Sequence, residues 1–112
     1  MTTEHLIILQ KSYDFEKQMY GYLKKFPQSE KFALTTEIKN TIYSFNKKII
    51  KATKVEKKKS ILYEADVELA HLRHLLRLSY DLKYMSKKSY EVSSLFTTEI
   101  GKMLGKWISN IK

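Results

Sequence analysis

Hydrophobic side chains recur along this chain every three or four residues, the spacing that places them on one face of an α-helix. Four segments carry the period, at about 4–25, 34–53, 55–85 and 87–111. No stretch alternates apolar and polar residues with the period of two that marks a β-strand. The pattern therefore predicts an all-α protein, with each helix about 30 Å long at 1.5 Å per residue.

The connections between these segments are short, and each has a different local signal. Pro27 ends the first segment, because proline disfavours the helical conformation in the residue before it. Ser86 can cap the start of the fourth segment. The stretch from Lys54 to Lys57 contains neither glycine nor proline, so tertiary packing must set the turn between the second and third segments. We predict a single domain, residues 1–112, folded as an antiparallel up-down-up-down four-helix bundle.

Composition excludes several protein classes. The chain has no cysteine, so it has neither disulfides nor thiolate metal sites. A hydrophobic fraction of 43% argues against disorder. The apolar run at the start, Leu6 to Leu9, is too short for a signal peptide or a membrane span. We therefore expect a cytoplasmic protein that does not enter a membrane.

Motifs for catalysis or metal binding are incomplete. Glu68-Leu69-Ala70-His71 matches the Glu-x-x-His element of di-iron bundles, but no second element of this kind is present to complete the site. No serine or threonine lies in a phosphate loop or a strand-to-helix nucleophile turn. We expect no catalytic residue, no metal and no cofactor. Gly101-x-x-x-Gly105 predicts instead that the fourth helix packs closely beside Trp107.

The net charge of the chain points to a binding function. The formal charge is +9, from 21 basic against 12 acidic residues, and an excess of this size attracts polyanions. Like charges four residues apart destabilise a helix by about 0.2–0.5 kcal/mol per pair, so a cluster of lysines favours a polyanion partner. The alternative is a solvated turn, stabilised by the helix dipole. Seven lysines form such a cluster around the connection between the second and third segments: Lys47, Lys48, Lys51, Lys54, Lys57, Lys58 and Lys59.

The only two arginines of the chain, Arg73 and Arg77, lie on one line of the third segment, away from its leucine face. Arginine binds phosphate through two parallel hydrogen bonds, and tyrosines nearby can stack on unpaired bases. This combination favours RNA binding. The alternative is packing against a neighbouring helix or subunit, with either arginine paired to Asp66 or Asp81. The tyrosines interleaved on this line are Tyr63, Tyr80 and Tyr84.

The apolar arc of the third segment is wider than a monomeric bundle requires. A single core needs a stripe only somewhat wider than about 100°. Because a fully exposed apolar stripe is unusual, the surplus predicts a second buried surface and hence a homo-oligomer. The residues that extend the arc are Val67, His71, Leu78 and Met85.

Three groups of residues resemble a known family. They are Lys25-Phe26-Pro27 with Phe32-Ala33-Leu34, then Leu72-Arg73-His74-Leu75-Leu76-Arg77-Leu78, and finally Glu99-Ile100-Gly101-Lys102-Met103-Leu104-Gly105-Lys106-Trp107-Ile108. They are similar to the accessory variability determinant (Avd) proteins of diversity-generating retroelements. Those proteins are in turn similar to the wider four-helix-bundle family encoded by ribosomal-RNA intervening sequences. The resemblance covers nearly the whole chain.

The resemblance implies a homopentameric barrel of four-helix bundles without enzymatic activity. It also implies binding to the retroelement's reverse transcriptase and to its structured template RNA, or an RNA/DNA hybrid, in support of mutagenic cDNA synthesis. By the same resemblance Arg73 and Arg77 contact the partner, and Lys102 and Lys106 fill the basic positions of the last motif. A structural or protein-interaction bundle that binds no nucleic acid is the alternative.

The chain departs from the family at the first turn. Gln28 and Lys31 stand where many relatives carry arginine, and Glu37 replaces a further basic residue. These departures argue against RNA contacts at that turn.

Overall fold

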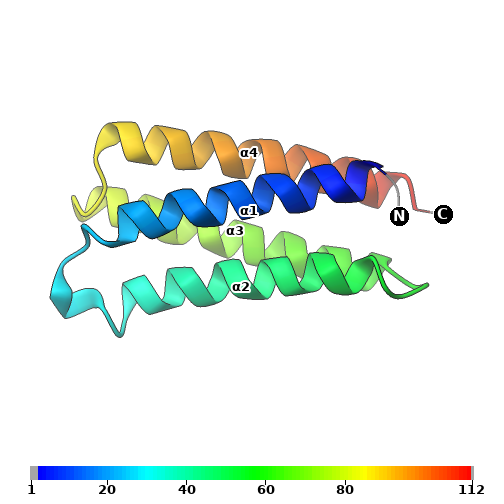
Figure 1. Ribbon diagram of the computed structural model, residues 1–112, viewed down its shortest axis with the longest axis horizontal. Coiled ribbons are helices and arrows are strands. Elements are labelled where there is room, and N and C mark those ends of the chain that lie inside the picture. Colours follow the sequence, from blue (N-terminus) through cyan, green and yellow to red (C-terminus); the bar gives the residue numbers. More distant parts are fainter. Residues whose placement is uncertain (1–2, 112) are drawn as a thin grey trace.

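The computed structural model describes residues 3–111, with side chains from residue 5 onward, and all regular secondary structure in this range is helical (Figure 1). No strand occurs among these residues, which confirms the all-α prediction. The elements are α1 (Thr3–Leu23), a 3₁₀ turn η1 (Gln28–Glu30), α2 (Leu34–Ala52), α3 (Lys59–Asp81) and α4 (Lys87–Ser109).

Consecutive helices run antiparallel in an up-down-up-down bundle. Helix α1 packs against α2 and α4, and both of these pack against α3. Figure 1 shows the α1–α2 and α3–α4 connections at one end of the bundle, with the α2–α3 connection at the other. The molecule measures 44 × 24 × 19 Å. Within the described range, no helix has the length and apolarity needed to cross a membrane.

The core takes side chains from all four helices at the predicted three- and four-residue spacing. Phe15, Phe45, Leu72 and Leu104 are among those almost completely buried. Burial of each large apolar side chain contributes about 1.5–3 kcal/mol, which makes this core the main source of stability. Trp107 closes one end, where its ring contacts the ring of His5 in α1 with 3.9 Å between centroids.

The two glycines of α4 do not provide the close contact that their spacing predicts. Gly105 is exposed, and a Cβ atom there would meet no other residue within 4 Å. A Cβ at Gly101 would lie 3.5 Å from Cδ2 of Leu69, an ordinary van der Waals distance. Neither position requires glycine, so the prediction of a tight glycine contact is wrong.

The connection between α2 and α3 is longer than predicted, because α3 begins at Lys59 rather than near Val55. The Lys58 ammonium donates a hydrogen bond to the Ala52 carbonyl at 2.7 Å and another to the Val55 carbonyl. Carbonyl groups at a helix C-terminus lack partners within the helix. Lys58 therefore supports a turn that contains no glycine or proline.

Helix α3 also ends earlier than predicted, at Asp81 rather than Met85. The Tyr84 amide donates to the Ser79 carbonyl and the Lys83 amide to the Tyr80 carbonyl, each at 2.9 Å. These two bonds form a Schellman motif, which needs a left-handed residue at the position of Lys83. Lys83 has φ of 66° there. Glycine usually fills this position, so the residues themselves carry no stop signal.

Substituting Lys83→Gly should stabilise the protein. A side chain in the left-handed conformation costs about 1–2 kcal/mol, and glycine avoids this cost but loses more entropy on folding. We expect a net gain of about 0.5–1 kcal/mol in the free energy of unfolding, measured by urea denaturation. The matched control is Lys102→Gly in the exposed middle of α4, which should lose up to about 1 kcal/mol. A destabilised Lys83→Gly protein would contradict this account of the turn.

Hydrogen bonds between side chains join α1 to α2 along their outer edge. Asn46 donates to Glu16 at 2.9 Å and also bonds to Ser12. The hydroxyl groups of Tyr20 and Tyr43 bond to each other. This bond, together with burial, raises the pKa of Tyr43 to about 12. The Tyr43 phenol therefore stays protonated at pH values where an unperturbed tyrosine ionises.

Candidate nucleic-acid interface

Helices α3 and α4 form a groove of about 550 Å³, which we call the arginine groove. Arg73 and Arg77 lie one helical turn apart on α3 and both line it. Helix α4 supplies the polar side chains of Ser94 and Thr97 on the opposite wall. The remaining lining residues are His74, Leu76, Asp81 and Tyr90.

Both arginines lie outside the core. Arg73 donates a hydrogen bond to the Thr98 hydroxyl at 3.1 Å, which links its side chain to α4. Arg77 Nε lies 3.6 Å from an Asp81 oxygen, and the Arg77 side chain is 75% exposed. An exposed pair of this kind contributes only about 0.3–0.5 kcal/mol. The predicted pairing with Asp81 is therefore present, but it is weak enough for a phosphate to replace.

The tyrosines on the arginine line are less available than their spacing predicts. Tyr80 stacks on Tyr90 with 4.6 Å between ring centroids and 9° between the planes. Tyr84 lies beyond the end of α3, and its hydroxyl donates to the Glu30 carboxylate at 2.9 Å. By accepting this bond, the carboxylate raises the pKa of Tyr84. Only Tyr63 remains half exposed for stacking on a base.

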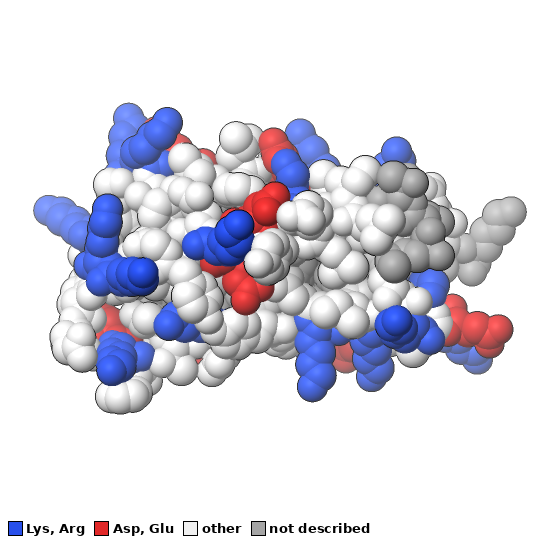
Figure 2. Space-filling model, in the orientation of Figure 1, with Lys and Arg blue, Asp and Glu red and all other residues white. Residues whose placement is uncertain are grey.

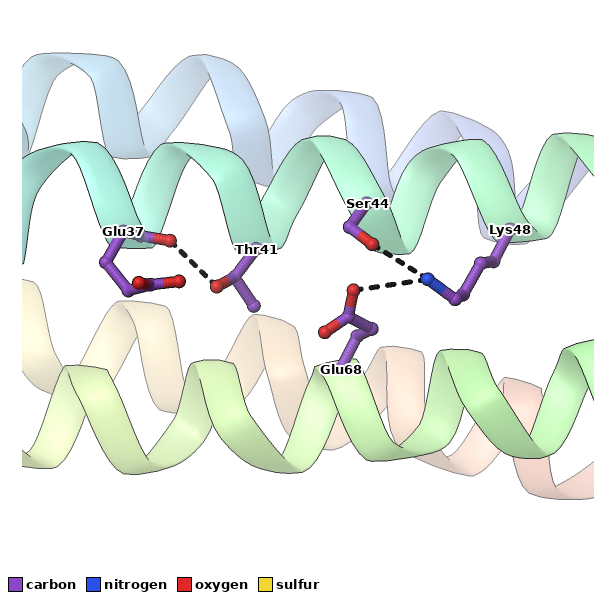
Figure 3. Close-up of polar contacts among 5 residues, drawn as sticks. All are labelled: Glu37, Thr41, Ser44, Lys48 and Glu68. Atoms are coloured by element: carbon purple, nitrogen blue, oxygen red, sulfur yellow. Dashed lines mark hydrogen bonds and ion pairs between the residues drawn. The ribbon is translucent and has the colours of Figure 1, made fainter.

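The seven lysines around the α2–α3 connection gather at one end of the bundle, and Figure 2 shows basic side chains along this end, at its lower right. Two of the seven are bonded within the protein. The Lys48 ammonium lies between α2 and α3, 2.8 Å from the Ser44 hydroxyl and 3.3 Å from the Glu68 carboxylate (Figure 3). Lys58 is held by the carbonyls that it caps. Five lysines remain exposed: Lys47, Lys51, Lys54, Lys57 and Lys59.

The opposite end of the bundle is also rich in lysine, which the sequence pattern does not predict. The exposed residues there come from the α1–α2 connection, the α3–α4 connection and the first turn of α4, and Figure 2 shows basic side chains at this end, on the left. These connections are far apart in sequence, so the density of charge along the chain carries no signal of this surface. The fold brings them together. They are Lys24, Lys25, Lys31, Lys83, Lys87 and Lys88.

Lys102 and Lys106 are exposed on α4, beyond the arginine groove. Thr98, which bonds Arg73, lies one turn before Lys102 on the same helix. Within the part of the chain that the structure describes, no group of three potential metal ligands is present. Glu68, half of the rejected Glu-x-x-His element, is bonded to Lys48 instead.

Of the four residues predicted to join copies of the chain, three are exposed on the surface of α3. Val67, His71 and Leu78 are exposed on α3, and Val67 is exposed over 67% of its surface. Met85 is only 5% exposed and belongs to the core of its own chain. Because α3 stops at Asp81, Met85 no longer follows the face of that helix, and its assignment to an interface is wrong.

Comparison with known proteins gives one match at the level of sequence families. A profile of the bAvd-like family matches residues 6–111, nearly the whole described range. The chain belongs to the bAvd-like family. The resemblance to Avd proteins is therefore confirmed, and family membership points to an accessory protein of a diversity-generating retroelement. No curated protein matches this chain.

One solved structure shows that the bAvd-like chain shares its fold with another protein. It is a crystal structure of a protein of unknown function from the S23 ribosomal protein family of Bacteroides thetaiotaomicron VPI-5482. The two match with a TM-score of 0.86 over 96% of this chain and 100% of the other, at 21% sequence identity. Identity this low establishes a common helical fold alone.

Proposed function

We propose that this bAvd-like chain is a non-enzymatic accessory protein that works in the cytoplasm. It binds the reverse transcriptase and the structured template RNA, or RNA/DNA hybrid, of a diversity-generating retroelement and supports mutagenic cDNA synthesis. One observation carries this proposal. The two arginines of the family-like motif are exposed in a groove on the outside of the bundle, where phosphate can reach them.

Binding of RNA in this proposal is mainly electrostatic. Lysine and arginine side chains neutralise phosphates and release the cations condensed on the RNA. Assembly into a homopentamer through Val67, His71 and Leu78 would present several copies of each basic surface to one RNA. Linked contacts of this kind increase overall affinity without any new type of contact.

The dependence of RNA affinity on salt tests this function. We expect the chain to bind a labelled structured RNA, with log K falling linearly against log salt by about 0.7–0.9 for each phosphate neutralised. Fluorescence anisotropy over a series of KCl concentrations measures this slope, and co-purification with the reverse transcriptase tests the second partner. Absent binding, or affinity that does not change with salt, would favour a structural or protein-interaction bundle instead.

A further inference from the structure

A second basic groove lies on the other side of the bundle, where the end of α1 and the turn η1 meet α2. It holds about 210 Å³, and we call it the first-turn groove. Three lysines line it, together with the ring of Tyr20, and no carboxylate is among its described lining residues. The arginine groove lies between α3 and α4, so the two grooves belong to different helix pairs. The three lysines are Lys24, Lys31 and Lys39.

Acidic residues from the same stretch of chain lie on a different surface. Glu30 and Glu37 line a neighbouring apolar groove, together with Leu75 and Leu78 of α3. The Glu30 carboxylate is also bonded to the Tyr84 hydroxyl. Among the residues that the structure describes, none of the ion pairs involves a lysine of the first-turn groove. The turn thus separates its negative charges from its positive ones.

Aromatic rings rather than carboxylates hold two of these lysines. The Lys39 ammonium lies 4.8 Å from the centre of the Tyr20 ring, and the Lys31 ammonium lies 5.5 Å from the centre of the Phe32 ring. Such contacts contribute about 0.5–1 kcal/mol at exposed sites and leave the positive charge intact. The bond between the Tyr20 and Tyr43 hydroxyls fixes one of the rings. The groove therefore keeps its positive charge.

We propose that the first-turn groove binds a phosphate group of an RNA strand, as a contact separate from the arginine groove. Its volume of about 210 Å³ is below the range of about 300–1,000 Å³ that encloses drug-sized ligands, so it fits a phosphodiester and leaves the bases outside. The identity of the anion as RNA rests on the proposed function. The grouping of the three lysines around the groove is seen in the structure and does not depend on that function.

Because its basic residues are lysines and not arginines, the first-turn groove should bind phosphate without selecting an RNA sequence. An ammonium acts as a point charge without the forked geometry of a guanidinium, and phosphate contacts position RNA without reading its sequence. The first-turn groove therefore adds affinity that is independent of sequence. Since the arginine groove lies between the other pair of helices, one chain contacts RNA on two sides. This proposal differs from the expectation drawn from Gln28, Lys31 and Glu37, which argues against RNA contacts at the first turn.

Removing two lysines from the groove tests this inference. Lys31→Ala with Lys39→Ala should weaken binding of a fluorescein-labelled single-stranded oligouridylate by about tenfold, and should reduce the salt slope by about 0.7 for each phosphate that the variant no longer neutralises. The matched control is Lys11→Ala with Lys17→Ala on α1, which removes the same formal charge outside both grooves and both lysine-rich ends. The control should weaken binding by less than about twofold. Circular dichroism of both variants verifies the fold.

The outcomes separate this inference from the proposed function. Equal losses of affinity in the groove variant and its control would overturn the inference, since bulk charge alone would explain them. The proposed function would stand in that case if Arg73→Ala with Arg77→Ala still lowered the affinity for RNA by more than about 100-fold. Failure of the wild-type chain to bind the oligouridylate at low salt would overturn both. As direct support, backbone amide signals of Gln28, Lys31 and Thr35 should shift on adding the oligouridylate, including in the double arginine variant.

Discussion

Replacing Arg73 and Arg77 together by alanine is expected to lower the affinity for template RNA and for the reverse transcriptase by more than about 100-fold. Each hydrogen-bonded contact to a charged group contributes about 1.5–3 kcal/mol, and two such contacts exceed the 2.8 kcal/mol or so that corresponds to a factor of 100. The fold should survive, because both side chains are exposed and the ion pair of Arg77 with Asp81 contributes little.

Two further variants make this experiment specific. Arg73→Lys with Arg77→Lys keeps both charges but loses the forked geometry, so its affinity should lie between those of the wild type and the alanine variant. Lys11→Ala with Lys17→Ala removes the same net charge from α1, outside both grooves and both lysine-rich ends, and should change affinity only slightly. Unchanged binding in the alanine variant, with thermal unfolding also unchanged, would contradict the role of these arginines.

Truncation of Leu76 to alanine should have the largest effect on stability. Leu76 is 1% exposed and lies in the core beneath the arginine groove. Replacing a buried leucine by alanine costs about 2–5 kcal/mol, because apolar burial is reduced and a cavity remains. This is a large part of the roughly 5–15 kcal/mol that stabilises a typical domain. Chemical denaturation followed by circular dichroism measures the loss.

Leu78→Ala is the matched control, because it makes the same change two residues later on the same helix. Leu78 is 40% exposed, so the loss of stability in an isolated chain should stay below about 1 kcal/mol. Equal losses at both positions would contradict the orientation of α3. If copies of the chain associate through Leu78, the unfolding midpoint of its variant should depend less on protein concentration than that of Leu76→Ala, whose interface is intact.

The helices themselves could be predicted because the spacing of core residues is local information. The ends of α3 could not, since neither end uses the residues that usually mark a boundary. Lys58 bonds the free carbonyls before the helix through its side chain, and Lys83 adopts the left-handed conformation after it. Misplacing this boundary also misplaced Met85 and Tyr84.

The arginine groove was partly predictable, whereas the first-turn groove was not. Arg73 and Arg77 stand at a helical spacing off the leucine face, which suffices to place them outside the core. Lys24, Lys31 and Lys39 belong to three different elements or connections, and only their arrangement in space forms a groove. The pairing of Tyr80 with Tyr90 likewise depends on the packing of α3 against α4.

The contact of His5 with Trp107 places the start of α1 beside the end of α4, at the end of the bundle that also carries the α2–α3 connection (Figure 1). An affinity tag or reporter domain attached to either terminus would therefore emerge next to the exposed lysines of that connection. An acidic tag would compete there with added nucleic acid from within the same molecule. Affinity measurements should therefore use tags without negative charge. The first-turn groove lies at the opposite end of the bundle, so a tag at either terminus should not block it.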